Sequence, residues 1–121
     1  MKRLMIAATL LAMPAAAQAM SVNEFLAKVN ALKAKGMLAL ASPDIKLLKG
    51  EMDTVSQAYR ADLIAQKSAG KPLHSCPPPK GKAKMNSNEL IAELESIPPA
   101  QRGMSMKAAF YGIMKRRYPC R

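Results

Sequence analysis

The sequence contains no tryptophan, one histidine, two cysteines, two phenylalanines and three tyrosines among its 121 residues. So few aromatic residues argue against a large β-sandwich or β-barrel. One histidine and two cysteines leave little material for a metal centre or a nucleophilic triad, so most enzyme classes are disfavoured. No hydrophobic run reaches the roughly 18 apolar residues that cross a bilayer, which argues against a polytopic membrane protein. Acidic residues are scarce too: 8 Asp and Glu stand against 19 Lys and Arg, for a net charge of +11.

The first residues have the pattern of a secretory signal peptide. Lys2 and Arg3 supply a positive start, and residues 4–13 form an apolar stretch too short to span a membrane. Ala17 and Ala19 occupy the small-residue positions of an A-x-A cleavage site. We expect cleavage after Ala19. A cut after Ala17 is the alternative, and the competing interpretation is an N-terminal helix of the folded domain.

Cleavage after Ala19 makes 1–19 a signal peptide and 20–121 a single helical domain in the periplasm, without a transmembrane segment. Loss of Lys2 and Arg3 leaves 17 basic and 8 acidic side chains, a net charge of +9. A domain of this length buries about 65% of the surface that its unfolded chain exposes, which is enough for one modest core. Half of all residues are hydrophobic, which argues against an intrinsically disordered chain.

Apolar residues recur at helical spacing in four parts of the mature chain, and no part alternates like a strand. Helices are expected at 22–35 and 43–69, followed by a short one that ends before Pro98 and a last one that ends before Pro119. The longest carries an apolar stripe made of Ile45, Leu48, Met52, Val55, Tyr59 and Leu63. Residues 37–41 predict one more turn, packed under the fold. The expected fold class is a small all-α bundle of about four helices with no sheet.

Polar residues and glycines mark the ends of these helices. The expected N-caps, whose side chains accept from the first turn, are Ser21, Ser42, Asn86 and Ser105. Gly36 and Gly70 are the expected stops, because glycine adopts the left-handed conformation at low cost. Gly50 lies inside the longest helix and allows a break there.

The two cysteines are expected to form one disulfide, because an exported chain folds in an oxidising compartment. Cys76 and Cys120 are 44 positions apart, so the loop-entropy model gives this crosslink about 4 kcal/mol at most. It would tie the end of the last helix to the proline-rich segment 71–85. Two alternatives are open. Cys76 could act as a nucleophile with His74 as its base, or His74 and the two cysteines could hold zinc.

Positive charge is concentrated in the second half of the chain. Residues 71–121 carry 10 basic and 3 acidic side chains. A charged patch of this kind raises the rate of encounter with an acidic partner. A solvated surface, an acidic protein and an anionic polymer or lipid are all compatible with it. Export and the scarcity of aromatic residues argue against nucleic acid.

The same half contains short motifs in a characteristic order. A Cys-Pro pair at 76–77 precedes a Leu-rich helix, the run P-P-A-Q-R follows at 98–102, and a Pro-Cys pair stands at 119–120. In these features residues 55–121 resemble the Tai-type immunity proteins of type VI secretion. These are small secreted helical proteins that neutralise peptidoglycan amidase effectors. The resemblance also implies that the two matching cysteines are paired.

The resemblance implies a periplasmic inhibitor that binds and blocks a cell-wall amidase, without being an enzyme and without a metal or cofactor. The proline-stiffened segment 77–84 is expected to enter the amidase cleft, since a rigid segment loses little entropy on binding. The partner could equally be another acidic protein surface. The expected partner contacts are Pro77, Pro78, Pro79, Lys80, Lys82, Lys84, Arg116 and Arg117.

The alternative function is that of a small basic envelope protein, a stress or adaptor module that binds anionic polymers or lipids through its basic half. A third interpretation is an enzyme that uses Cys76. The family tends to dimerise through helices, and the 43–69 helix is long enough to project beyond a four-helix core. A homodimer is therefore compatible with the sequence.

Overall fold

The computed structural model of the chain describes residues 19–82 and 85–121. Within these residues the fold is all-α, with four α-helices and no β-strand, so the predicted fold class is confirmed. The α-helices are α1 (Val22–Lys35), α2 (Asp44–Ser68), α3 (Ser87–Glu95) and α4 (Met106–Arg117). Two short 3-10 helices complete the fold: η1 (Gly36–Ala41) lies between α1 and α2, and η2 (Pro99–Gln101) lies between α3 and α4. Residues 1–18 of the predicted signal peptide lie outside the described part.

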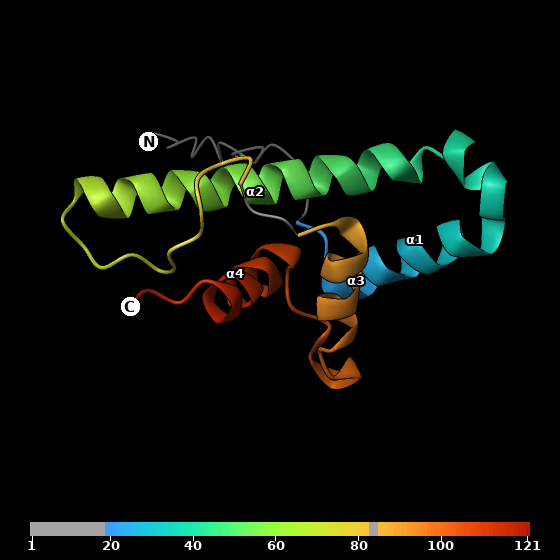
Figure 1. The fold of residues 1–121 in the computed structure, drawn as a ribbon. Coiled ribbons are helices and arrows are strands. Elements are labelled where there is room, and N and C mark those ends of the chain that lie inside the picture. The colour runs from blue at the N-terminus through green and yellow to red at the C-terminus, as the bar shows by residue number, and fades with distance from the viewer. Residues whose placement is uncertain (1–18, 83–84) are drawn as a thin grey trace, which may run out of the picture.

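The core lies between α2 and the other three α-helices, which are placed on one side of it (Figure 1). The fully buried side chains of α1, α3 and α4 are Val22, Leu94, Met106 and Ile113. The apolar stripe of α2 contributes Leu48, Val55 and Tyr59. The other members of that stripe, Ile45, Met52 and Leu63, are only half-buried. No helix in the described ranges is long and apolar enough to cross a membrane.

Most helix ends follow the predicted signals, but the prediction for α2 is wrong: Pro43 stands at its N-cap position, and the Ser42 side chain accepts only from the Asp44 N–H, at 3.3 Å. The side chains of Ser21, Asn86 and Ser105 each accept a hydrogen bond from the backbone N–H three residues later, at 2.8 to 3.1 Å. Gly36 and Gly70 follow α1 and α2 with φ angles of 58° and 67°, a region that favours glycine. Gly50 does not interrupt α2, since tertiary packing outweighs its cost of about 1 kcal/mol relative to alanine.

Backbone hydrogen bonds join the beginning of the fold to the beginning of α4. The Val22 N–H donates to the Met104 carbonyl at 3.0 Å, and the Met106 N–H donates to the Met20 carbonyl at 2.8 Å. Through this pairing the folded structure already includes Met20, the residue that directly follows the predicted cleavage site.

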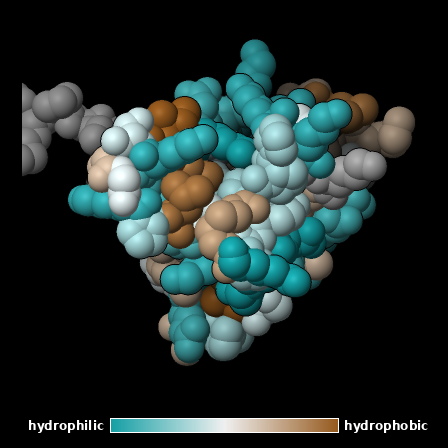
Figure 2. Space-filling view, turned by 60° about the vertical axis from the view of Figure 1, so that its left-hand side comes forward, coloured by the Kyte–Doolittle hydropathy of each residue, from teal (hydrophilic) through white to brown (hydrophobic). Residues whose placement is uncertain are grey.

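The expectation that residues 37–41 pack under the fold is wrong. They belong to η1, in which Met37, Leu38 and Leu40 are 85, 77 and 79% exposed. The segment reverses the chain between α1 and α2 at one end of the molecule, away from the core (Figure 1). Hydrophobic residues reach the surface on another face as well. Figure 2 shows them there as a narrow strip between hydrophilic residues.

Candidate functional site

A disulfide joins Cys76, in the loop after α2, to Cys120, beyond the end of α4. The two Cα atoms lie 5.0 Å apart, and the predicted pairing is confirmed. Beside it, the Cys76 N–H donates to the Tyr118 carbonyl oxygen at 2.8 Å. The loop and the C-terminal residues are therefore held together by one covalent bond and one backbone hydrogen bond. Such a crosslink is typical of a protein that folds in an oxidising compartment.

Two side chains of α2 bind the same loop. The Gln66 Oε1 atom accepts from the His74 N–H at 2.8 Å, and the Arg60 guanidinium donates through Nη1 to the Pro78 carbonyl oxygen at 3.2 Å. We call residues 74–82 the anchored segment. In Figure 1 this yellow stretch runs back along α2 and crosses it.

A buried polar contact fixes the start of the anchored segment. The hydroxyl groups of Tyr59 and Ser75 share a hydrogen bond, and both residues are at most 1% exposed. The His74 Nδ1 atom lies 3.2 Å from the Ser75 Oγ atom. Because a buried hydroxyl without a partner costs about 1–3 kcal/mol, this pair favours one conformation of the segment.

The predicted contact residues of the anchored segment differ in exposure. Pro77 and Pro78 are half-buried, whereas Pro79, Lys80 and Lys82 are exposed. The Lys82 N–H donates to the Pro79 carbonyl oxygen at 2.9 Å and closes a turn. The exposed end of the segment therefore presents two lysines on a turn that begins with proline. Lys84 lies outside the described residues.

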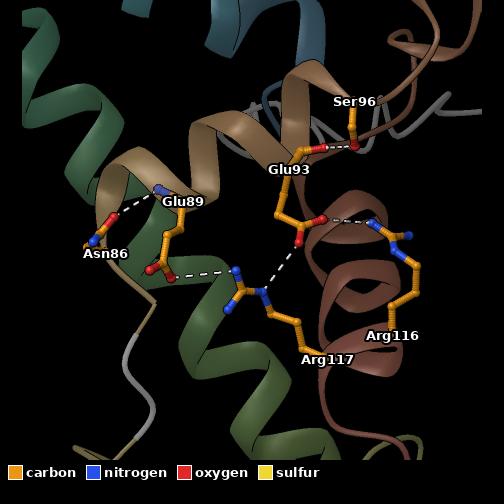
Figure 3. Close-up of polar contacts among 6 residues, drawn as sticks. All are labelled: Asn86, Glu89, Glu93, Ser96, Arg116 and Arg117. Carbon is orange, nitrogen blue, oxygen red and sulfur yellow. Dashed lines mark hydrogen bonds and ion pairs between the residues drawn. The ribbon is translucent and has the colours of Figure 1, made fainter.

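Arg116 and Arg117 are engaged with α3 (Figure 3). Arg117 lies 3.4 Å from Glu93 and 3.5 Å from Glu89, and Arg116 lies 3.3 Å from Glu93. These ion pairs hold the C-terminal turn of α4 against α3. Their first role is therefore structural, and a contribution to a partner surface stays a prediction.

The arginine of the 98–102 motif has internal partners as well. Arg102 donates through Nε to the Ile97 carbonyl at 2.9 Å and through Nη2 to the Glu95 carbonyl at 2.8 Å. It thus satisfies carbonyl groups that the end of α3 leaves without helical partners. In this chain the motif stabilises the connection between α3 and α4.

The disulfide argues against two alternatives from the sequence analysis, a nucleophilic Cys76 and a zinc site made of His74 and the two cysteines. A cystine sulfur is neither a thiolate nucleophile nor an ordinary zinc ligand, so Cys76 has no thiol for His74 to activate. Ser75 lies next to His74, but its hydroxyl is fully buried against Tyr59. Within 19–82 and 85–121, no group of three or more His, Cys, Asp or Glu side chains is arranged to hold a metal ion.

A second polar contact ties α4 to α2. The Tyr111 hydroxyl donates to the Asp62 carboxylate. Burial, together with the hydrogen bond and the negative charge of Asp62, raises the pKa of the Tyr111 phenol well above its ordinary value. The neutral phenol is thus the form that the fold stabilises.

We expect Tyr111 to resist ionisation in the folded protein. Its folded-state pKa is above the unfolded value of about 10, so the associated stability is complete below about pH 10 and is lost as the pH rises through the folded value. A spectrophotometric titration should show a late phenol ionisation that Tyr111→Phe removes. In Asp62→Asn the phenol should titrate earlier, and an unchanged curve would contradict this account.

An apolar groove of about 1070 Å³ runs along α2 and is lined on its other side by residues of α1, α3 and α4. Its apolar lining includes Leu32, Leu48, Met52, Leu90, Ile91 and Met114. Four basic side chains, Lys33, Lys49, Arg60 and Lys80, line it as well. We call this concave surface the α2 groove. It adjoins the anchored segment. Lys80 is part of that segment, Arg60 donates to the Pro78 carbonyl oxygen within it, and both side chains line the groove.

The sequence analysis missed the groove and the role of Arg60. It placed Ile45 and Met52 on one apolar stripe without indicating that both line a groove. The available signal was a second row on α2, at steps of three or four, that mixes apolar and polar residues: Ile45, Lys49, Met52, Ser56, Arg60 and Ile64.

Comparison of the chain with protein families, curated proteins and solved structures finds no match. The fold, the disulfide and the groove are therefore known from the structure of this chain alone.

Proposed function

We propose that the protein is a periplasmic immunity-type inhibitor that binds a peptidoglycan amidase effector and blocks its active-site cleft. The observation that carries the proposal is the anchored segment. The Cys76–Cys120 disulfide holds it to the chain end, while Gln66 and Arg60 hold it to α2. This agrees with the Cys-Pro and Pro-Cys order on which the resemblance to immunity proteins depends.

A segment held in this way suits insertion into a cleft. Its conformation is already restricted by a disulfide, several hydrogen bonds and three consecutive prolines, so little conformational entropy is left to lose on binding. Lys80 and Lys82 are exposed at its end. Blocking a cleft needs no reactive group from the inhibitor, and positive charge favours an acidic cleft rim.

The test is co-expression with an amidase encoded beside this protein and directed to the periplasm. The wild-type chain should prevent lysis, and the purified pair should form a complex at micromolar concentration or below. The double variant Lys80→Glu/Lys82→Glu should weaken binding at least about tenfold, because it reverses both exposed charges.

The matched control is Lys46→Glu/Lys67→Glu, which makes the same charge change at exposed positions of α2. It should leave the affinity within about twofold of the wild-type value, because charges outside an interface act mainly through the association rate. No rescue from lysis together with no complex at micromolar concentration would contradict the proposal.

The N-terminus offers an independent prediction about export. The Met20 N–H donates to the Glu51 Oε1 atom at 3.2 Å. Cleavage after Ala19 converts this backbone nitrogen into a charged α-amino group that faces a carboxylate. We expect the chain that starts at Met20 to be more stable at pH 6 than its N-acetylated form, by about 0.5–1 kcal/mol.

Urea denaturation of the two forms measures the difference. It should disappear in Glu51→Gln and above about pH 8, where α-amino groups lose their proton. Mass spectrometry of the exported protein identifies the cleavage site. If the chain begins at Gln18, Met20 keeps its amide nitrogen and this ion pair does not form.

A further inference from the structure

The α2 groove has the chemical character of a ligand site. Its volume of about 1070 Å³ is at the upper end of the range for small-molecule pockets, about 300–1,000 Å³. The lining is mainly apolar, with a few polar and charged groups, as is typical of such pockets. Several lining side chains, among them Met52, Leu32 and Ile91, are only half-buried, so apolar surface is left open to solvent.

The shape of the groove favours a long and narrow occupant. Along α2 its lining extends from Ile45 to Ile64, a rise of about 28 Å. One leaflet of a bilayer core is about 15 Å thick, so the groove exceeds the length of one acyl chain. An α-helix of that length, about 10 Å across, would fill about 2200 Å³. The groove has about half of this volume, so such a helix could place only one face in it.

The two ends of the α2 groove differ in how their basic side chains are paired. Toward α1, Lys33 lies 3.8 Å from Glu95, and Lys49 lies one turn from Asp53, which also lines the groove. At the opposite end Arg60 and Lys80 line the groove, and no ion pair within the described residues involves either of them. This second end therefore has the stronger preference for an anion.

Arg60 is also held in position. Its Nη1 atom donates to the Pro78 carbonyl oxygen, and its guanidinium lies 5.9 Å from the centre of the Tyr59 ring. A guanidinium has five N–H donors in a planar array that matches a carboxylate. A fixed guanidinium beside an apolar groove is suited to recognise a carboxylate joined to an apolar chain.

From this arrangement we propose that the α2 groove binds a long-chain fatty acid. The carboxylate lies at Arg60 and Lys80, and the acyl chain lies over Met52 toward Leu48 and Leu32. A second copy of the chain is a poorer occupant, because each copy carries a net charge of +9 after the predicted cleavage and would bring a basic surface against a basic rim. The proposal does not rest on amidase inhibition.

The experiment is a calorimetric titration of the delipidated, disulfide-bonded protein with hexadecanoate below its critical micelle concentration. Binding should be one to one. The uncharged monoglyceride of the same acid should bind at least about tenfold more weakly, since hydrogen bonds to a charged group are stronger than those to a neutral one. Octanoate should bind at least about a hundredfold more weakly, because it buries far fewer methylene groups.

Four variants locate the ligand. Met52→Glu places a charge on the floor of the groove and should abolish binding, with folding checked by circular dichroism. Lys80→Ala should weaken binding about tenfold. Lys49→Ala, at the other end, should have less than half of that effect. Lys46→Ala, which replaces an exposed lysine of α2 outside the groove, should have none.

Three results would overturn the proposal. Equal affinity for hexadecanoate and the monoglyceride would mean that no carboxylate is recognised. Equal losses in the Lys80 and Lys46 variants would place the ligand elsewhere. A dimer that Met52→Glu dissociates, seen by sedimentation without any binding of hexadecanoate, would show that a second copy fills the groove. Amidase binding, measured separately, should be unaffected by Met52→Glu.

Discussion

The variant Cys76→Ser/Cys120→Ser is expected to lose about 4 kcal/mol of unfolding free energy. The bond closes a loop with a sequence separation of 44, and a loop of this length corresponds to about 4 kcal/mol in the chain-entropy model. That is a large part of the 5–15 kcal/mol typical of a small domain. Urea denaturation, followed by circular dichroism, measures the loss.

Reduction provides the matched control for this variant. Dithiothreitol should destabilise the wild-type protein to a similar extent and should leave the double-serine variant unchanged. The variant should also expose the anchored segment to proteolysis, because only hydrogen bonds, such as those to Gln66, Arg60 and Tyr118, then hold it in place. A loss below about 1 kcal/mol would mean that the disulfide does not constrain the fold.

Tyr59→Ala is expected to cost about 3–5 kcal/mol, the second large effect. Tyr59 is 1% exposed, and its ring centre lies 5.4 Å from that of Phe110 and 5.3 Å from that of Tyr111. Its hydroxyl is also the buried partner of Ser75. The substitution therefore leaves a cavity where α2, α4 and the anchored segment meet.

Tyr59→Phe separates the hydroxyl from the ring. It keeps the aromatic packing and removes one partner of Ser75, so we expect a loss of about 1–2 kcal/mol. Tyr118→Phe serves as the control, because Tyr118 is half-buried and should change stability by less than about 0.5 kcal/mol. Equal effects of the two phenylalanine variants would argue against a special role for the contact between Tyr59 and Ser75.

Features decided by neighbouring residues could be predicted from the sequence. Ser21, Asn86 and Ser105 cap helices because a side-chain oxygen needs only the N–H groups of the next turn. Gly36 and Gly70 end helices for an equally local reason. The disulfide was predictable because only two cysteines are present.

Features that depend on distant parts of the chain could not be predicted. Periodicity identified an apolar face of α2 but not which part of it other helices cover, so it did not indicate that Met52 is only half-buried and lines a groove. Arg117 pairs with residues of α3 that lie 24 and 28 positions earlier, and no local pattern indicates such a choice. The exposure of η1 likewise depends on where the chain reverses.

One disulfide anchors the segment after α2, and we propose that it forms because the protein is exported. Intact-mass spectrometry of the native protein, isolated in the presence of an alkylating reagent, tests this most directly. The account predicts a chain that begins at Met20, carries no alkyl groups and gains two only after reduction. A chain that retains its first residues, or that is alkylated at both cysteines before reduction, would contradict it.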